Sequence, residues 1–111
     1  MKTSNFARSW GVSIAGKAPA WFDGPEYKKL APKYSFFKAY KEGIIGEAEY
    51  TDLFKLKVLE PLDVVQTYKE LVALQDEDVV LLCWEKPGEF CHRRIVAEWF
   101  EDKLGIKVEE V

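Results

Sequence analysis

Two cysteines, a histidine and two adjacent arginines occupy one short stretch, LLCWEKPGEFCHRRIVAEWF, which runs from Leu81 to Phe100. Their side chains offer distinct chemistry: a nucleophilic thiol at Cys91, proton transfer at His92, and anion binding by the guanidiniums of Arg93 and Arg94. His92 is the only histidine in the chain. Whether these groups can act together depends on the elements that hold them.

The cations of this stretch stand where a helix is predicted to begin. Apolar residues then recur at helical spacing, and Gly105 ends the pattern; they are Ile95, Val96, Trp99, Phe100 and Leu104. The first turn of a helix is already positive, so each cation there costs ~0.3–1 kcal/mol. We therefore predict that Arg93 and Arg94 hold an anion, such as a phosphate, a sulfate or a carboxylate. The alternative is an internal ion network with Glu85, Glu89, Glu98 or Glu101.

Cys91 lies at or beside this first turn, where the helix dipole and nearby cations lower the pKa of a thiol. It is therefore a candidate nucleophile, and the alternative is a small buried residue at a strand–helix junction. His92 is a candidate for proton transfer. Glu85 follows a predicted strand directly and is a candidate base, a hydroxyl-binding carboxylate, or an ion-pair partner of Arg93.

A metal site would have to combine Cys83, Cys91, His92 and a carboxylate. Cys-x7-Cys-His is not a recognised zinc spacing, and adjacent residues such as Cys91 and His92 are awkward to direct at one ion. Cys83 lies inside an apolar run, where a core role is the expected one. We therefore predict neither a metal nor a cofactor.

The bulk composition indicates a single globular domain over residues 1–111. The chain is 48% hydrophobic and 32% charged, and it has no apolar run near the ~20 residues that span a bilayer. The N-terminal residues lack the apolar core of a secretory signal, and only two cysteines occur, so we predict a cytoplasmic protein with reduced thiols. The net charge of −3 gives no overall attraction for nucleic acid.

The pattern of apolar residues predicts alternating strands and helices. Strands are expected from Trp10 to Gly16, with Thr3–Ala7 in the same or an adjacent strand, at Val79–Cys83, and from Ile106 at a sheet edge. Helices are expected from Pro25 to before Pro32, at Tyr34–Glu42, at Glu47–Leu59, from Glu60 to the acidic run Asp76–Asp78, and from Cys91 or His92 to Gly105. Residues 17–25 are expected to form a loop.

This order predicts an α/β fold, a small three-layer domain with a short, mostly parallel sheet flanked by helices. The continuous apolar run Val79–Cys83 should be its central strand, covered on both faces. Ligands in such sheets bind outside the carboxyl ends of the strands. The loop Trp84–Cys91 lies at such an end, and Arg8, at the end of the first strand, is a candidate second guanidinium for the ligand.

The stretch from Leu81 to Phe100 resembles the C-terminal signature of domain-of-unknown-function family 488. In that signature a hydrophobic strand leads to Cys-x-Glu, a short loop, then Cys-His-Arg and an amphipathic helix. The N-terminal TSNFARSW, the Leu-Ala-Pro at Leu30–Pro32 and the closing strand to Val111 are also similar to a compact branch of the family.

The resemblance implies a cytosolic α/β protein of bacterial or phage type, and it covers the whole chain. It carries over as motif residues Cys83, Glu85, Cys91, His92 and Arg93, with Ser4 and Arg8 as N-terminal counterparts. It brings no activity with it, so the reaction must be sought in the site.

Three functional hypotheses follow. The first is an enzyme or binding protein for a nucleotide-like or other small anionic ligand, with Cys91, His92 and Glu85 catalytic and Arg93, Arg94, Arg8, Ser4 and Cys83 binding the ligand. The second is a nucleic-acid-associated module that uses Trp10, Trp21, Phe22, Tyr34 and the pair Lys28–Lys29. The third is a structural or partner-binding protein whose arginines form an internal ion network. The acidic net charge disfavours the second.

Overall fold

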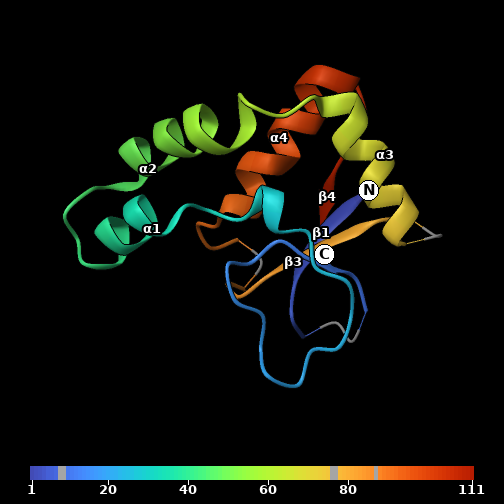
Figure 1. Cartoon of the computed structure of the whole chain (residues 1–111), viewed down its shortest axis with the longest axis horizontal. Helices are drawn as coiled ribbons and strands as arrows, with labels where there is room; N and C mark the ends of the chain where they lie inside the picture. Colours follow the sequence, from blue (N-terminus) through green and yellow to red (C-terminus); the bar gives the residue numbers. More distant parts are fainter. Residues whose placement is uncertain (8–9, 76–77, 87) are drawn as a thin grey trace.

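Four short strands form one fully parallel sheet in the order β2-β3-β1-β4; β1, β3 and β4 are labelled in Figure 1. The structure is a computed structural model of residues 1–111, and it describes all of them except 8–9, 76–77 and 87. The strands are β1 (Lys2–Asn5), β2 (Val12–Ser13), β3 (Val80–Cys83) and β4 (Glu109–Glu110). As predicted, β3 is an interior strand buried along its whole length, and the last strand lies at an edge.

The helices are α1 (Tyr34–Lys41), α2 (Glu47–Phe54), α3 (Val64–Leu74) and α4 (His92–Leu104). A π-helical turn, Lys55–Leu59, continues α2, and the backbone N–H of Glu60 still donates to Lys55. For that reason α3 begins later than the predicted Glu60: its N-cap is Asp63, whose carboxylate accepts the N–H of Gln66 at 2.9 Å. None of the helices in the described part of the chain has the length and apolarity needed to cross a membrane.

The helix predicted from Pro25 is wrong, because this segment extends alongside β2. Ser13 donates its N–H to the carbonyl of Pro25 at 2.9 Å, and Tyr27 donates its N–H to the carbonyl of Ser13 at 2.8 Å. Only a single 3-10 turn, Lys28–Leu30, follows. The backbone of edge strand β2 needs hydrogen-bond partners, and this tertiary demand outweighs the local helix-start signal.

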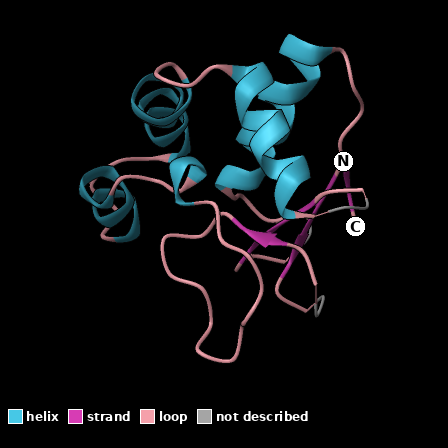
Figure 2. Cartoon of the chain, turned by 45° about the vertical axis from the view of Figure 1, so that its right-hand side comes forward, coloured by secondary structure: helices cyan, strands magenta, loops and turns pink. Residues whose placement is uncertain are grey.

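The helices cover one face of the sheet, and irregular chain covers the other (Figures 1 and 2). On the helical face, Leu81 belongs to a large core with Leu71, Val96 and Phe100. On the opposite face, a smaller core consists of Phe6, Ala15, Val80 and Leu82, with Ala18 and Phe22 packed against it. The α/β class and the parallel sheet are as predicted. Among the described residues, the second face of the sheet is covered by a loop and not by helices.

The connection from β1 to β2 passes close to β3, which lies between them in the sheet. At Gly11 the backbone adopts φ +143°. A Cβ there would lie 2.8 Å from both Cγ of Leu82 and the carbonyl oxygen of Val80. Glycine is therefore required at this crossing for two reasons, its conformation and the lack of space.

Candidate active site

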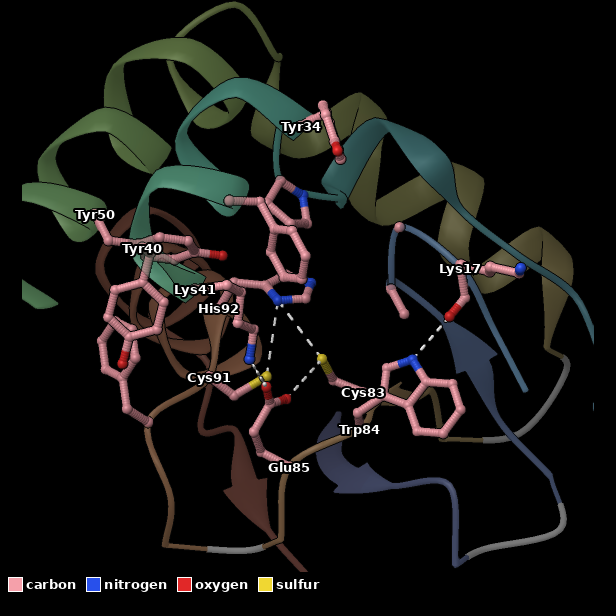
Figure 3. A pocket seen from close by; sticks show the side chains of 15 residues that line it. Lys17, Tyr34, Tyr40, Lys41, Tyr50, Cys83, Trp84, Glu85, Cys91 and His92 are labelled. Carbon is pink, nitrogen blue, oxygen red and sulfur yellow. Dashed lines mark hydrogen bonds and ion pairs between the residues drawn. The ribbon is translucent and has the colours of Figure 1, made fainter. Parts of the chain in front are cut away.

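A cavity of about 680 Å³ lies at the carboxyl end of β3 (Figure 3). Its walls are largely aromatic. The aromatic lining residues are Tyr34, Phe37 and Tyr40 from α1, Tyr50 from α2, Trp84, and Phe90 from the loop before α4. Tyr40, Tyr50 and Phe90 contact one another, with ring centroids 5.1–5.5 Å apart. The cavity therefore offers flat apolar surfaces to a ligand, at the position that the parallel sheet predicts.

Three of the predicted residues meet at one end of this cavity. Cys83 is the last residue of β3, Cys91 is the N-cap of α4, and His92 is its first helical residue. Nδ1 of His92 lies 3.5 Å from Sγ of Cys83 and 3.7 Å from Sγ of Cys91. All three residues are buried and line the cavity. Both cysteines are free thiols.

The orientation of His92 is fixed by the backbone of a neighbouring segment. Its Nε2 lies 2.7 Å from the carbonyl oxygen of Ile14. A carbonyl only accepts hydrogen bonds, so Nε2 must carry a hydrogen. In the neutral ring, Nδ1 then bears a lone pair, and that lone pair is directed at the two sulfurs.

The two thiols differ in acidity. Burial opposes ionisation of Cys91, but hydrogen bonds with Cys83 and His92, and the charge of His92, outweigh it and lower its pKa to about 6. The hydrogen bond with Cys91, together with burial and the nearby negative groups, raises the pKa of Cys83. Cys91 is therefore the more acidic of the two thiols, and its hydrogen bond with Cys83 stabilises its ionised form.

Glu85 extends this cluster toward α1. Its Oε2 accepts a hydrogen bond from Sγ of Cys83 at 3.3 Å, and its Oε1 lies 3.6 Å from Nζ of Lys41. Burial opposes its ionisation, but hydrogen bonds with the cysteines and its own backbone amide, together with the Lys41 charge, lower the pKa of Glu85. Burial, followed by the charge of Cys91 and of other nearby negative groups, raises the pKa of Tyr50, so its hydroxyl stays a proton donor.

The two arginines do not line the cavity, and an acid of the protein itself accompanies them. Nε of Arg93 donates to Glu110 at 3.0 Å and its Nη2 to the carbonyl of Lys86 at 2.9 Å. Nε of Arg94 lies 3.9 Å from Glu110, and its Nη1 donates to Thr3 at 3.3 Å. The third nitrogen of Arg93, Nη1, is buried without a partner among the residues that the structure describes.

Glu110 is thus the counter-ion that the structure provides for the cations at the start of α4. It was not among the acids considered from the sequence, because only the pairing of β4 with β1 brings it there. Burial would raise its pKa, but hydrogen bonds from Gly88 and Arg93 and the charges of Arg93 and Arg94 lower it. An external anion at the two arginines stays a prediction.

Of the N-terminal candidates, Ser4 lies in β1 away from the cavity lining, and its hydroxyl donates to the carbonyl of Val111 at 2.7 Å. Arg8 lies outside the described residues. The sequence interpretation missed Lys41 and Tyr50, which come from α1 and α2. The only signal for that wall was the concentration of aromatic residues in the N-terminal half.

The objection raised against a metal site is wrong in one respect. Cys91 and His92 are adjacent in sequence, yet their donor atoms do converge with that of Cys83, all within 4.8 Å of one another. Cys91 precedes the first turn in an extended conformation, with φ −156° and ψ 147°, and His92 is helical. This change of backbone conformation directs two neighbouring side chains to the same point.

Fold and cluster together define a small parallel α/β protein with two thiols and an imidazole at its strand ends. The chain belongs to the DUF488-N3a family, described as the active DUF488-N3 subclade, whose model matches residues 5–104. The predicted family resemblance is thereby confirmed. Comparisons with curated proteins and with solved structures each gave no match.

Proposed function

We propose that this protein is an enzyme that attacks an electrophilic carbon of a small, planar, nucleotide-like substrate with the sulfur of Cys91. The observation that carries the proposal is the position of Nδ1 of His92. Its lone pair faces both thiols at 3.5 and 3.7 Å, with the ring held from behind by Ile14. A nucleophile, a base and a group that orients the base recur in covalent catalysis.

In the proposed reaction, the proton of Cys91 passes to Nδ1 of His92, and the sulfur forms a C–S bond to the substrate carbon. The bond from that carbon to the leaving group breaks, and the leaving group takes the electron pair and the proton on Nδ1. Water then donates a proton to Nδ1 as its oxygen bonds to the carbon. The C–S bond breaks, its electron pair returns to the sulfur of Cys91, and the proton on Nδ1 returns to that sulfur.

The cavity walls support the proposed substrate class. A flat heterocyclic ring would pack against the aromatic side chains of α1 and α2. Lys41 also lines the cavity, and its Nζ lies 3.6 Å from Oε1 of Glu85. Lys17 contributes its backbone to the rim, where its carbonyl accepts the indole N–H of Trp84 at 2.7 Å, and its ammonium points away (Figure 3).

The other two hypotheses gain less from the structure. For a nucleic-acid module, the positive charge of Lys28 and Lys29 is reduced by Glu26 and Glu70, which lie 3.2 and 3.4 Å from their Nζ atoms. An internal ion network is present around Glu110, but the residues of the cavity lie outside it. That network therefore accompanies the proposed enzyme site and does not compete with it.

The test is a screen of nucleosides, nucleotides and related heterocycles with the purified protein, followed by mass spectrometry of the products. Wild-type protein should convert a substrate of this class, and Cys91→Ser should not, while still binding it. Cys83→Ser should retain part of the activity, because Cys83 only stabilises the thiolate. Turnover that survives in Cys91→Ser would overturn the assignment of the nucleophile.

A further inference from the structure

We propose that Cys83, Cys91 and His92 also bind a single zinc ion, a metal that the proposed reaction itself does not require. The inference stands on the placement of three donor atoms, two sulfurs and one nitrogen, within 4.8 Å of one another. Thiolates and imidazoles are the ligands that zinc prefers in proteins. The three residues come from the end of β3 and the start of α4, so regular secondary structure holds them.

The donor separations match a tetrahedral zinc centre. With Zn–S of ~2.3 Å and Zn–N of ~2.05 Å, tetrahedral angles require S···N separations of ~3.6 Å and an S···S separation of ~3.8 Å. The S···N separations here are 3.5 and 3.7 Å. The two sulfurs lie within 4.8 Å of each other. They therefore need to approach by at most about 1 Å to reach the S···S separation of a zinc centre.

His92 is already prepared as a ligand. Its Nδ1 faces the sulfurs, and its Nε2–H donates to the carbonyl of Ile14 at 2.7 Å. Metal-binding histidines almost always place the second ring nitrogen on such an acceptor, which fixes the tautomer and the plane of the ring. The carbonyl of Ile14 thus lies where proteins place the hydrogen-bond acceptor for the second ring nitrogen of a zinc-binding histidine.

Glu85 is the candidate for the fourth position. Its Oε2 lies 3.3 Å from Sγ of Cys83, near the ~3.6 Å expected between a thiolate and a carboxylate on one tetrahedral zinc. All four residues line the cavity, so a molecule in the cavity is the other possible fourth ligand. In that case Glu85 would accept a hydrogen bond from it.

Zinc and the proposed substrate would compete for the same sulfur. A zinc-bound thiolate of Cys91 is no longer free to attack carbon, and the lone pair of Nδ1 is no longer free to accept a proton. The metal-bound and metal-free forms are therefore alternative states of one site. Zinc should inhibit the reaction reversibly, and a chelator should restore it.

The first experiment measures binding without reference to activity. Protein reduced and stripped with a chelator is titrated with Co²⁺, which reports thiolate ligation by its sulfur-to-metal charge-transfer absorption, and Zn²⁺ is then added as competitor. The wild type should bind one Co²⁺ with this absorption and lose it to one Zn²⁺, while Mg²⁺ should leave it unchanged. A titration without the charge-transfer absorption would overturn the proposal.

Variants localise the site. Cys83→Ser, Cys91→Ser and His92→Ala each remove a direct ligand, so each should weaken Zn²⁺ binding by more than the ~10–100-fold that loss of an outer-shell partner typically costs. Glu98→Gln, which removes a carboxylate from a separate surface hollow beside α4, is the matched control and should bind as the wild type does. Thermal melts with and without Zn²⁺ show which variants remain folded.

The two proposals can fail separately. Substrate turnover that needs Cys91, in a protein that binds no Zn²⁺, would remove the zinc site and leave the enzyme. One Zn²⁺ bound through both cysteines, with no turnover of any screened heterocycle, would leave the zinc site and remove the proposed reaction. Zn²⁺ binding that persists when both cysteines are replaced would refute the assignment of the ligands.

Discussion

The ion network at the start of α4 yields the sharpest stability prediction. Arg93 is fully buried, and Glu110, only 15% exposed in its side chain, is its acidic partner at 3.0 Å. Removing one partner of a buried ion pair strands the other charge and typically costs ~3–5 kcal/mol. Because Glu110 keeps some contact with solvent, we expect Glu110→Ala to cost about 3 kcal/mol, the lower end of that range.

This loss translates into a large shift of the melting temperature. An unfolding entropy of about 2.1 cal/mol/K per residue gives about 0.23 kcal/mol/K for this chain, so 3 kcal/mol lowers Tm by about 13 °C. Glu109→Ala is the matched control, since Glu109 is 53% exposed and pairs only with the exposed Lys107 among the ion pairs of the described residues. That variant should lose no more than about 2 °C.

Thermal unfolding followed by circular dichroism, with urea unfolding as a second measurement, tests this prediction. The expected result is a drop for Glu110→Ala several times larger than that for Glu109→Ala. Equal, small shifts in the two variants would mean that Glu110 is not the counter-ion of Arg93. In that case the earlier prediction of an external anion at the arginines would be favoured.

Two further predictions concern the same fold. The pKa of Glu110 is lowered in the folded protein. Its contribution to stability is therefore present above its unfolded pKa of ~4.3 and is lost as the pH falls through its folded pKa. Between neutral and acidic pH, the unfolding free energy should decline more in the wild type than in Glu110→Ala. At Gly11, alanine would combine φ +143° with contacts of 2.8 Å, and should cost at least about 1–3 kcal/mol. Gly16→Ala, which meets nothing within 4 Å, should unfold like the wild type; equal melts for these two variants would refute the close crossing over β3.

Those parts of the fold that carry a local signal could be predicted from the sequence. The unbroken apolar run before Trp84 identified β3, and the helical spacing after His92 with Gly105 at its end identified α4. Gly105 is indeed left-handed, with φ 67°. The segment after Pro25 was mispredicted because its local helix signal is overridden by pairing with β2.

The candidate site was predicted only in part, because its geometry depends on contacts between distant segments. Cys91, His92 and Glu85 were named from their place at a strand end and a helix start. Their convergence with Cys83 requires the extended N-cap, and the tautomer of His92 requires Ile14, 78 positions away. The partner of Arg93 requires the register of β4. Neither residue spacing nor helix-dipole arguments contain this information.

The measurement that tests the central claim most directly is the relative rate at which iodoacetamide labels the two cysteines of the native protein near neutral pH, read by peptide mass spectrometry. With the pKa of Cys91 lowered to about 6 and that of Cys83 raised, the account predicts that Cys91 is labelled first, and that His92→Ala slows its labelling. Preferential labelling of Cys83, or a Cys91 rate unchanged by His92→Ala, would contradict it.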